Sequence, residues 1–120
     1  MATLELHLEK YRAFKASAAA AGVAAEAKVE LLFLAAYQII DACAAKKGAH
    51  INKHQNVRQE LQKNTAILGD HTTKVWRAFQ ELQGESRSRI VYGAKWTAID
   101  LREAEERFQS IESKCLEVLK

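Results

Sequence analysis

Apolar residues recur at helical spacing along most of the chain, and isolated glycines separate the stretches that show this pattern. Apolar positions three and four residues apart share one face of a helix. The most regular stripe is near the C-terminus: Leu101, Ala104, Phe108, Ile111, Cys115 and Val118. Thr97 precedes this stripe as an N-cap, with Asp100 three residues later, so the pattern predicts a helix that begins after Thr97.

The most apolar stretch, "LLFLAAYQII" at 31–40, predicts the central helix of the fold, from about Ala25 to Lys47. It is apolar on nearly every side, which is typical of a helix surrounded by others. Basic residues in its last turn and Gly48 directly after it mark its end. The stretch is too short to span a bilayer, which needs about 20 apolar residues, and Glu30 and Asp41 bracket it.

Three further helices follow from the same pattern. One begins behind Thr3 and runs to about Ala20, and a short one covers Lys53 to Lys63. For the short helix, Asn52 is the expected N-cap and Gln55 the partner that closes a capping box. A long helix covers about Thr72 to Tyr92 and is weakened at Gly84; the residues it is expected to bury are Val75, Trp76, Phe79 and Leu82.

Composition supports an all-α fold. The chain has 120 residues, no proline and five glycines, and strong helix formers dominate it. Four long helices and one short helix predict a single-domain antiparallel bundle over 1–120. The first residues do not resemble a secretory signal, so we expect a cytoplasmic protein without a membrane segment. Cys43 and Cys115 lie among apolar neighbours and are expected to be reduced core residues.

The net charge is only +3, but the basic residues are unevenly distributed. Residues 46–63 contain five Lys or Arg and one acid, and residues 84–96 contain three and one. Basicity therefore collects at two junctions between predicted helices, where a polyanion or phosphate group would be attracted. The alternative is solvated helix ends, because Lys and Arg near a C-terminus also favour the helix dipole.

Metal and cofactor chemistry finds little support in the sequence. His50 and His54 are four residues apart, but the predicted helix begins between them and no third ligand is evident, so no metal or cofactor is expected. His54 is better explained by local packing or hydrogen bonding, although a role as general acid or base stays open. His7 and His71 are expected on the surface. Glycine-rich phosphate loops and nucleophile elbows are absent from the sequence.

The stretch "SRSRIVYGAKW" at 86–96 contains three basic and two aromatic residues and no acid. In a continuous helix, Arg89 and Tyr92 share a face and Arg87 points elsewhere. A guanidinium group beside a tyrosine ring can hold a phosphate and stack a base. The alternative is that Tyr92 and Trp96 are packing residues at the turn between two helices.

Two segments resemble small free-standing HEPN domains. In "AAYQIIDACAAKKGAHINKHQNV" (35–57), the similar pattern is an Ala-Tyr pair, an apolar helix ending in Lys-Gly, a short loop, and a histidine three residues before a valine. In "FQELQGESRSRIVYG" (79–93), it is an arginine followed by four residues and Tyr-Gly. Together the segments cover about a third of the chain, and the matching positions are Ala36, Tyr37, Lys47, Gly48, His54, Val57, Arg87, Tyr92 and Gly93.

The resemblance implies an α-helical bundle that usually dimerises, with the fourth-helix motifs of both subunits facing a shared cleft. Many HEPN domains are metal-independent ribonucleases, often toxins or defence components, in which a histidine follows the motif arginine after four to six residues. Others bind RNA or nucleotides without catalysis, or are partners of a minimal nucleotidyltransferase. Here Arg87 matches the arginine, but Tyr92 occupies the first permitted histidine position. Tyrosine, with a pKa near 10, is a poor proton acceptor at neutral pH.

The leading hypothesis is a homodimeric HEPN-like domain that binds RNA or a nucleotide in a basic cleft at the dimer interface, in a toxin–antitoxin or defence setting. Its expected ligand-binding residues are Arg87, Arg89 and Tyr92 at the centre and Lys47, Lys53 and His54 on the rim. The alternatives are an interaction partner of a nucleotidyltransferase and a metal-independent ribonuclease. Catalysis, if present, would involve Arg87, Tyr92 and His54.

Overall fold

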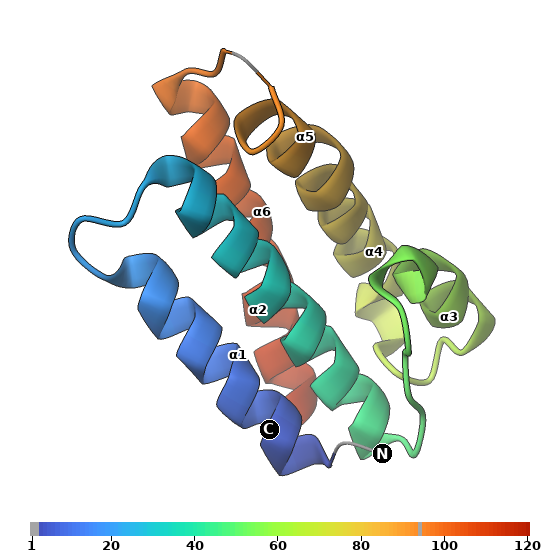
Figure 1. Cartoon of the computed structure of the whole chain (residues 1–120). Coiled ribbons are helices and arrows are strands. Elements are labelled where there is room, and N and C mark those ends of the chain that lie inside the picture. The colour runs from blue at the N-terminus through green and yellow to red at the C-terminus, as the bar shows by residue number, and fades with distance from the viewer. Residues whose placement is uncertain (1–2, 94) are drawn as a thin grey trace.

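The computed structural model describes residues 3–93 and 95–120, and within these ranges the chain is helical without any strand (Figure 1). The elements in chain order are α1 (Leu4–Ala19), α2 (Ala25–Lys46), the 3₁₀ turn η1 (His54–Asn56), α3 (Val57–Lys63), the 3₁₀ turn η2 (Gly69–His71), α4 (Thr72–Glu81), the π-helical turn η3 (Leu82–Ser86), α5 (Arg87–Ile90) and α6 (Ala98–Leu119). The prediction of an all-α protein is confirmed.

The long helices lie along a common direction, and α2 is at their centre (Figure 1). It packs against α1 along its length and also contacts α6, α4 and α5, whereas the short α3 packs against α4 at the side. Most side chains between Val29 and Ala44 are buried. The predicted central position of this helix is therefore confirmed, because an element enclosed on all sides needs the continuous apolar surface that its sequence supplies.

Three predicted helix ends are confirmed by their hydrogen bonds. Thr3 accepts a bond from the backbone N–H of Leu6, at 3.2 Å, and caps α1. Thr97 and Asp100 form the reciprocal capping box that begins α6. Gly48 follows α2 with a φ of 73°, the left-handed conformation that glycine adopts at little cost.

The short predicted helix begins differently from the expectation. Residues 54–56 form a single 3₁₀ turn, and the α-helical part covers only Val57–Lys63. Neither segment has a side-chain cap, so the capping box predicted for Asn52 and Gln55 is wrong. Lys53 takes the N-cap position instead, which places His54 in the first turn, against α2.

The fourth predicted helix is continuous from Thr72 to Ile90 but changes its winding at 82–86. This π-helical turn contains Gly84, the residue expected to weaken the helix. The helix ends at Ile90, two residues before the predicted end at Tyr92. A π turn advances the chain by fewer degrees per residue than an α-helix does, so every side chain that follows it is rotated about the helix axis relative to a regular helix.

The core contains the predicted stripes of α4 and α6, and it also encloses both cysteines. Cys43 and Cys115 are fully buried free thiols, and the Cys43 Sγ lies 3.6 Å from the Cys115 carbonyl oxygen. The pKa of the Cys115 thiol is raised well above its ordinary value, first by its hydrogen bond with Cys43 and then by burial. Among the described residues, none of the helices combines the length and apolar character needed to cross a bilayer.

Candidate functional site

Arg87 is the centre of the most specific polar arrangement on the surface. Its Nε donates to both carboxylate oxygens of Glu30, at 2.8 and 3.2 Å. The guanidinium carbon lies 4.6 Å from the centre of the Phe33 ring and 5.5 Å from that of Tyr92. One terminal nitrogen also donates to the Tyr92 hydroxyl, at 3.3 Å. The guanidinium group is thus oriented by one acid and two aromatic rings.

His54, in the turn η1, contacts the ring of Phe33 as well. Its ring meets Phe33 edge-on, with the centres 5.2 Å apart and an angle of 84° between the planes. The His54 Nδ1 is 3.2 Å from Nε2 of Gln83. Phe33 therefore brings together the histidine and the arginine that sequence analysis identified separately. Below, "the Arg87 cluster" means Glu30, Phe33, His54, Gln83, Arg87 and Tyr92.

The π-helical turn η3 sets the geometry of this cluster. Gln83 lies within the turn and Arg87 directly follows it, so the turn determines where both side chains point along α2. π turns are rare because they interrupt the regular hydrogen bonding of a helix, and they are found frequently at functional sites. Gly84 is visible in the sequence as a weak point of the helix, but no sequence pattern indicates that Gln83 lies beside His54.

The pKa of His54 is lowered from its ordinary value of 6.5. Burial is the main cause, and the nearby positive charge of Arg87 adds to it, while Glu30 acts in the opposite direction. A histidine whose pKa lies below 6.5 is mostly neutral at pH 7. The Arg87 cluster thus holds a neutral imidazole near a permanent cation.

This shift predicts a specific pH dependence of stability. Because the folded protein binds the His54 proton more weakly than the unfolded chain does, the stabilising contribution of neutral His54 is fully present above pH 6.5. It is lost as the pH falls through the lower pKa of the folded state. We expect the melting temperature of the wild type to fall more steeply between pH 7 and pH 5 than that of His54→Gln. Parallel curves from differential scanning fluorimetry would contradict the assignment.

Arg89 and Tyr92 do not share a face as predicted. Arg89 pairs with Asp100 at the start of α6, at 2.9 Å, and Tyr92 receives its hydrogen bond from Arg87 instead. The reason is that the helix ends at Ile90, so Tyr92 lies beyond the last turn, where helical spacing no longer applies. Tyr92 is 69% exposed, which excludes the packing role considered for it, whereas Trp96 does pack against the core.

The two lysines expected on the rim lie in different places. Lys53 directly precedes His54 in the chain and is exposed. Lys47 follows the last turn of α2 and is separated from Glu30 by 17 residues, or about 25 Å of helix at 1.5 Å per residue. The structure therefore brings Arg87, Tyr92 and His54 together and leaves Arg89 and Lys47 outside, whereas Lys53 is next to His54 only in the sequence.

An open groove lies along α4 and η3. It has a volume of about 570 Å³, and its lining residues are Arg58, Trp76, Arg77, Gln80, Glu81, Gly84 and Glu85. The Arg58 guanidinium carbon lies 4.2 Å from the centre of a Trp76 ring, and Arg58 is four residues after His54 in the chain. The groove repeats the combination of arginine and aromatic ring seen in the Arg87 cluster, but its two glutamates balance the formal charge of its two arginines.

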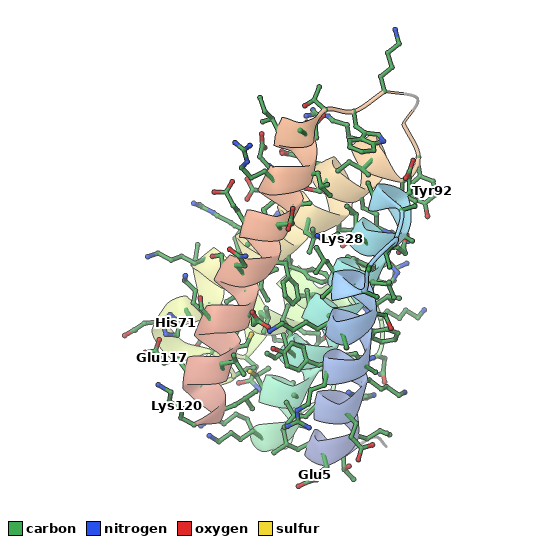
Figure 2. The ribbon with its side chains drawn as sticks, turned by 90° about the vertical axis from the view of Figure 1, so that its left-hand side faces the viewer. Glu5, Lys28, His71, Tyr92, Glu117 and Lys120 are labelled. Carbon is green, nitrogen blue, oxygen red and sulfur yellow. The ribbon has the colours of Figure 1, made fainter. Side chains whose placement is uncertain are left out.

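A second polar group is buried at the other end of the molecule. His7, expected on the surface, is only 4% exposed, and it lies beside Asp41 and His50. One donor atom from each of these three residues lies within 4.8 Å of the others. Figure 2 shows Tyr92 at the upper end of the helices and Glu5, in the first turn of α1, at the lower end. His50 and His54 thus belong to separate sites, and the pairing considered from their spacing does not occur.

His71 is half-buried and pairs with Glu117 of α6, at 3.4 Å (Figure 2). Comparison with protein-family models, with characterised proteins and with solved structures finds no match to this chain.

Proposed function

We propose that the protein is a HEPN-like helical bundle that binds single-stranded RNA or a nucleotide at the Arg87 cluster. The observation that carries this proposal is the placement of Arg87 and His54 on one aromatic ring, with the exposed Tyr92 beside them. The two motifs that resemble HEPN domains are separated by 21 residues in sequence, and their key side chains meet at Phe33. An antiparallel arrangement of the long helices is part of the proposal.

The chemistry of the cluster suits a nucleotide. Glu30 uses the Nε of Arg87, and Tyr92 accepts from one terminal nitrogen, so further guanidinium donors remain for phosphate oxygens. The exposed ring of Tyr92 offers a surface on which a base can stack, worth about 1–3 kcal/mol per base. The groove with Arg58 and Trp76 supplies a similar pair, as expected for a strand longer than one nucleotide.

A homodimer would enclose this surface. Tyr92 and Ile99 are 69% and 61% exposed, although both are large and partly or wholly apolar. They flank the junction between α5 and α6, next to the Arg87 cluster. A second copy that covers this junction would bury both side chains and bring two clusters to one cleft, which is the arrangement proposed here.

The proposal is tested by the affinity for short single-stranded RNA, measured by fluorescence anisotropy at fixed salt. Arg87→Ala is expected to lose at least about tenfold in affinity, since each charge-assisted contact is worth about 1.5–3 kcal/mol. Arg89→Ala is the matched control: it removes the same charge two residues away, from a side chain paired with Asp100. Arg87→Lys is expected to resemble Arg87→Ala, because lysine lacks the planar fork.

If Arg87→Ala and Arg89→Ala bind short RNA with equal affinity, the Arg87 cluster is not the RNA-binding site. Uniform weakening by every lost cation would instead indicate unspecific attraction to the phosphate backbone, recognisable by its steep dependence on salt.

Metal-independent ribonuclease activity is the second candidate, and it is favoured by one observation. His54 is close enough to Arg87 for the charge of Arg87 to lower its pKa, so it can take the place of the histidine missing after Arg87. However, with the Gln83 amide donating to Nδ1, the neutral ring carries its proton on Nε2 and donates rather than accepts there. This orientation favours binding over general-base catalysis. If the purified protein cleaves RNA in EDTA and His54→Ala abolishes the cleavage, ribonuclease activity is favoured over binding alone.

A further inference from the structure

The buried residues His7 and Asp41 and the half-buried His50 come from three separate parts of the chain. His7 is in the second turn of α1, Asp41 in the last turns of α2, and His50 in the loop between α2 and η1. The His7 Nε2 is 3.5 Å from one carboxylate oxygen of Asp41, and the His50 Nδ1 is 3.6 Å from the other. This group plays no part in the RNA-binding proposal.

The hydrogen bonds of His7 leave one of its ring nitrogens without a partner. Its Nδ1 is 2.8 Å from the Oε1 of Gln38, an acceptor, so the ring proton is on Nδ1. In the neutral ring, Nε2 then carries a bare lone pair, and this buried atom has no hydrogen-bond partner in the structure. It faces the Asp41 carboxylate, so two acceptors point at each other. Such a pair is stabilised by a cation between the two atoms, which can be a proton on Nε2 or a metal ion.

The spacing of the donor atoms fits a metal ion. Bonds of 2.0–2.1 Å in a tetrahedral site place neighbouring ligand atoms roughly 3.3–3.4 Å apart. The separations of 3.5 Å from His7 Nε2 to Asp41 Oδ2 and of 3.6 Å from His50 Nδ1 to Asp41 Oδ1 are each close to this value, but they involve different carboxylate oxygens. One donor atom from each of the three residues lies within 4.8 Å of the other two, so the side chains would close toward a single carboxylate oxygen when an ion binds.

The surrounding hydrogen bonds are those that metal ligands commonly have. A histidine that binds a metal usually donates its other ring N–H to an oxygen, which Gln38 supplies here. The Asp41 Oδ1 accepts the backbone N–H of Ile51 at 3.0 Å, which orients the carboxylate. Both contacts fix ligand atoms before any ion arrives.

We propose that His7, Asp41 and His50 bind a divalent transition-metal ion, foremost Zn²⁺. Two imidazole nitrogens and one carboxylate oxygen are ligands that zinc accepts, and three protein ligands leave a fourth position for water. His50 is 28% exposed and provides access from solvent. The ion would join α1, α2 and the loop that leads to Lys53 and His54, and its main effect would be to stabilise this end of the fold.

The test is titration of the full chain, freed of metal with EDTA, with Zn²⁺ in competition with a chromophoric chelator. We expect one ion per chain and a rise in melting temperature of about 10 °C when free Zn²⁺ is 100 times the dissociation constant. Ring ¹⁵N shifts of His7 and His50 should move on addition of Zn²⁺, and this measurement needs no variant. Absence of stoichiometric binding, or unchanged shifts of both rings, would overturn the proposal.

Three variants locate the ion. His50→Ala, at a half-buried loop position, is expected to weaken Zn²⁺ binding more than about 100-fold, and Gln38→Leu by roughly 10–100-fold, as second-sphere changes do. His71→Ala is the control, because His71 pairs with Glu117 elsewhere and its loss should leave the affinity unchanged. If His71→Ala weakens binding while His50→Ala does not, the ion is bound at another site and the assignment is wrong.

Discussion

Replacement of Phe33 by alanine is expected to lower the free energy of unfolding by about 3–5 kcal/mol, the range found for buried Phe→Ala changes. Phe33 is 1% exposed and stacks on Phe79 with the ring centres 5.2 Å apart. The change removes a large side chain from the centre of the fold and leaves a cavity that the surrounding helices fill only in part. Equilibrium unfolding in urea, followed by tryptophan fluorescence, measures the loss.

Phe33→Leu separates the structural role of this ring from its role in the Arg87 cluster. A change of similar volume is expected to cost less than about 1.5 kcal/mol. It also removes the aromatic face on which the guanidinium group of Arg87 lies, so the affinity for short RNA should fall. Phe108→Leu is the matched control: Phe108 of α6 is buried to a similar extent, but it lies away from Arg87, beside Lys15 of α1 and Lys28 of α2.

Equal RNA affinities for the two leucine variants would show that Phe33 acts only through stability. A loss of affinity confined to Phe33→Leu, at equal stability, would show that the ring orients Arg87.

The second large effect is expected for Asp41→Ala, measured in EDTA so that no metal contributes. The carboxylate accepts the backbone N–H of Ile51 and lies beside two histidines. Its removal leaves a buried donor without an acceptor and the histidines without their acid. We expect the free energy of unfolding to fall by about 3 kcal/mol. Asp41→Asn keeps an acceptor for Ile51 and is expected to lose roughly 1–2 kcal/mol.

Asp70→Ala is the control for this comparison, because Asp70 is exposed and its loss should change stability by less than about 0.5 kcal/mol. A loss below 1 kcal/mol for Asp41→Ala would show that the Tyr37 hydroxyl, which donates to the Ile51 carbonyl at 2.6 Å, holds the loop by itself. In that case Asp41 would matter only when an ion is bound.

The positions of the long helices and their order in the chain follow from local sequence patterns. Thr3, Gly48 and the pair of Thr97 and Asp100 mark helix ends through bonds within a few residues, so these ends are predictable without the rest of the fold. The central position of α2 follows equally from its apolar surface. These features depend on local backbone chemistry and on helical periodicity, both of which are visible in a single sequence.

Which side chains meet depends on how distant elements pack. Arg87, His54 and Phe33 come from three elements, and the helix ends at Ile90, so the helical spacing that predicts a shared face for Arg89 and Tyr92 does not apply. The prediction that His7 lies on the surface is wrong, because packing of α1 on α2 buries it beside Asp41. Contacts between distant residues depend on helix packing, and helix packing is set by the whole chain rather than by any local pattern.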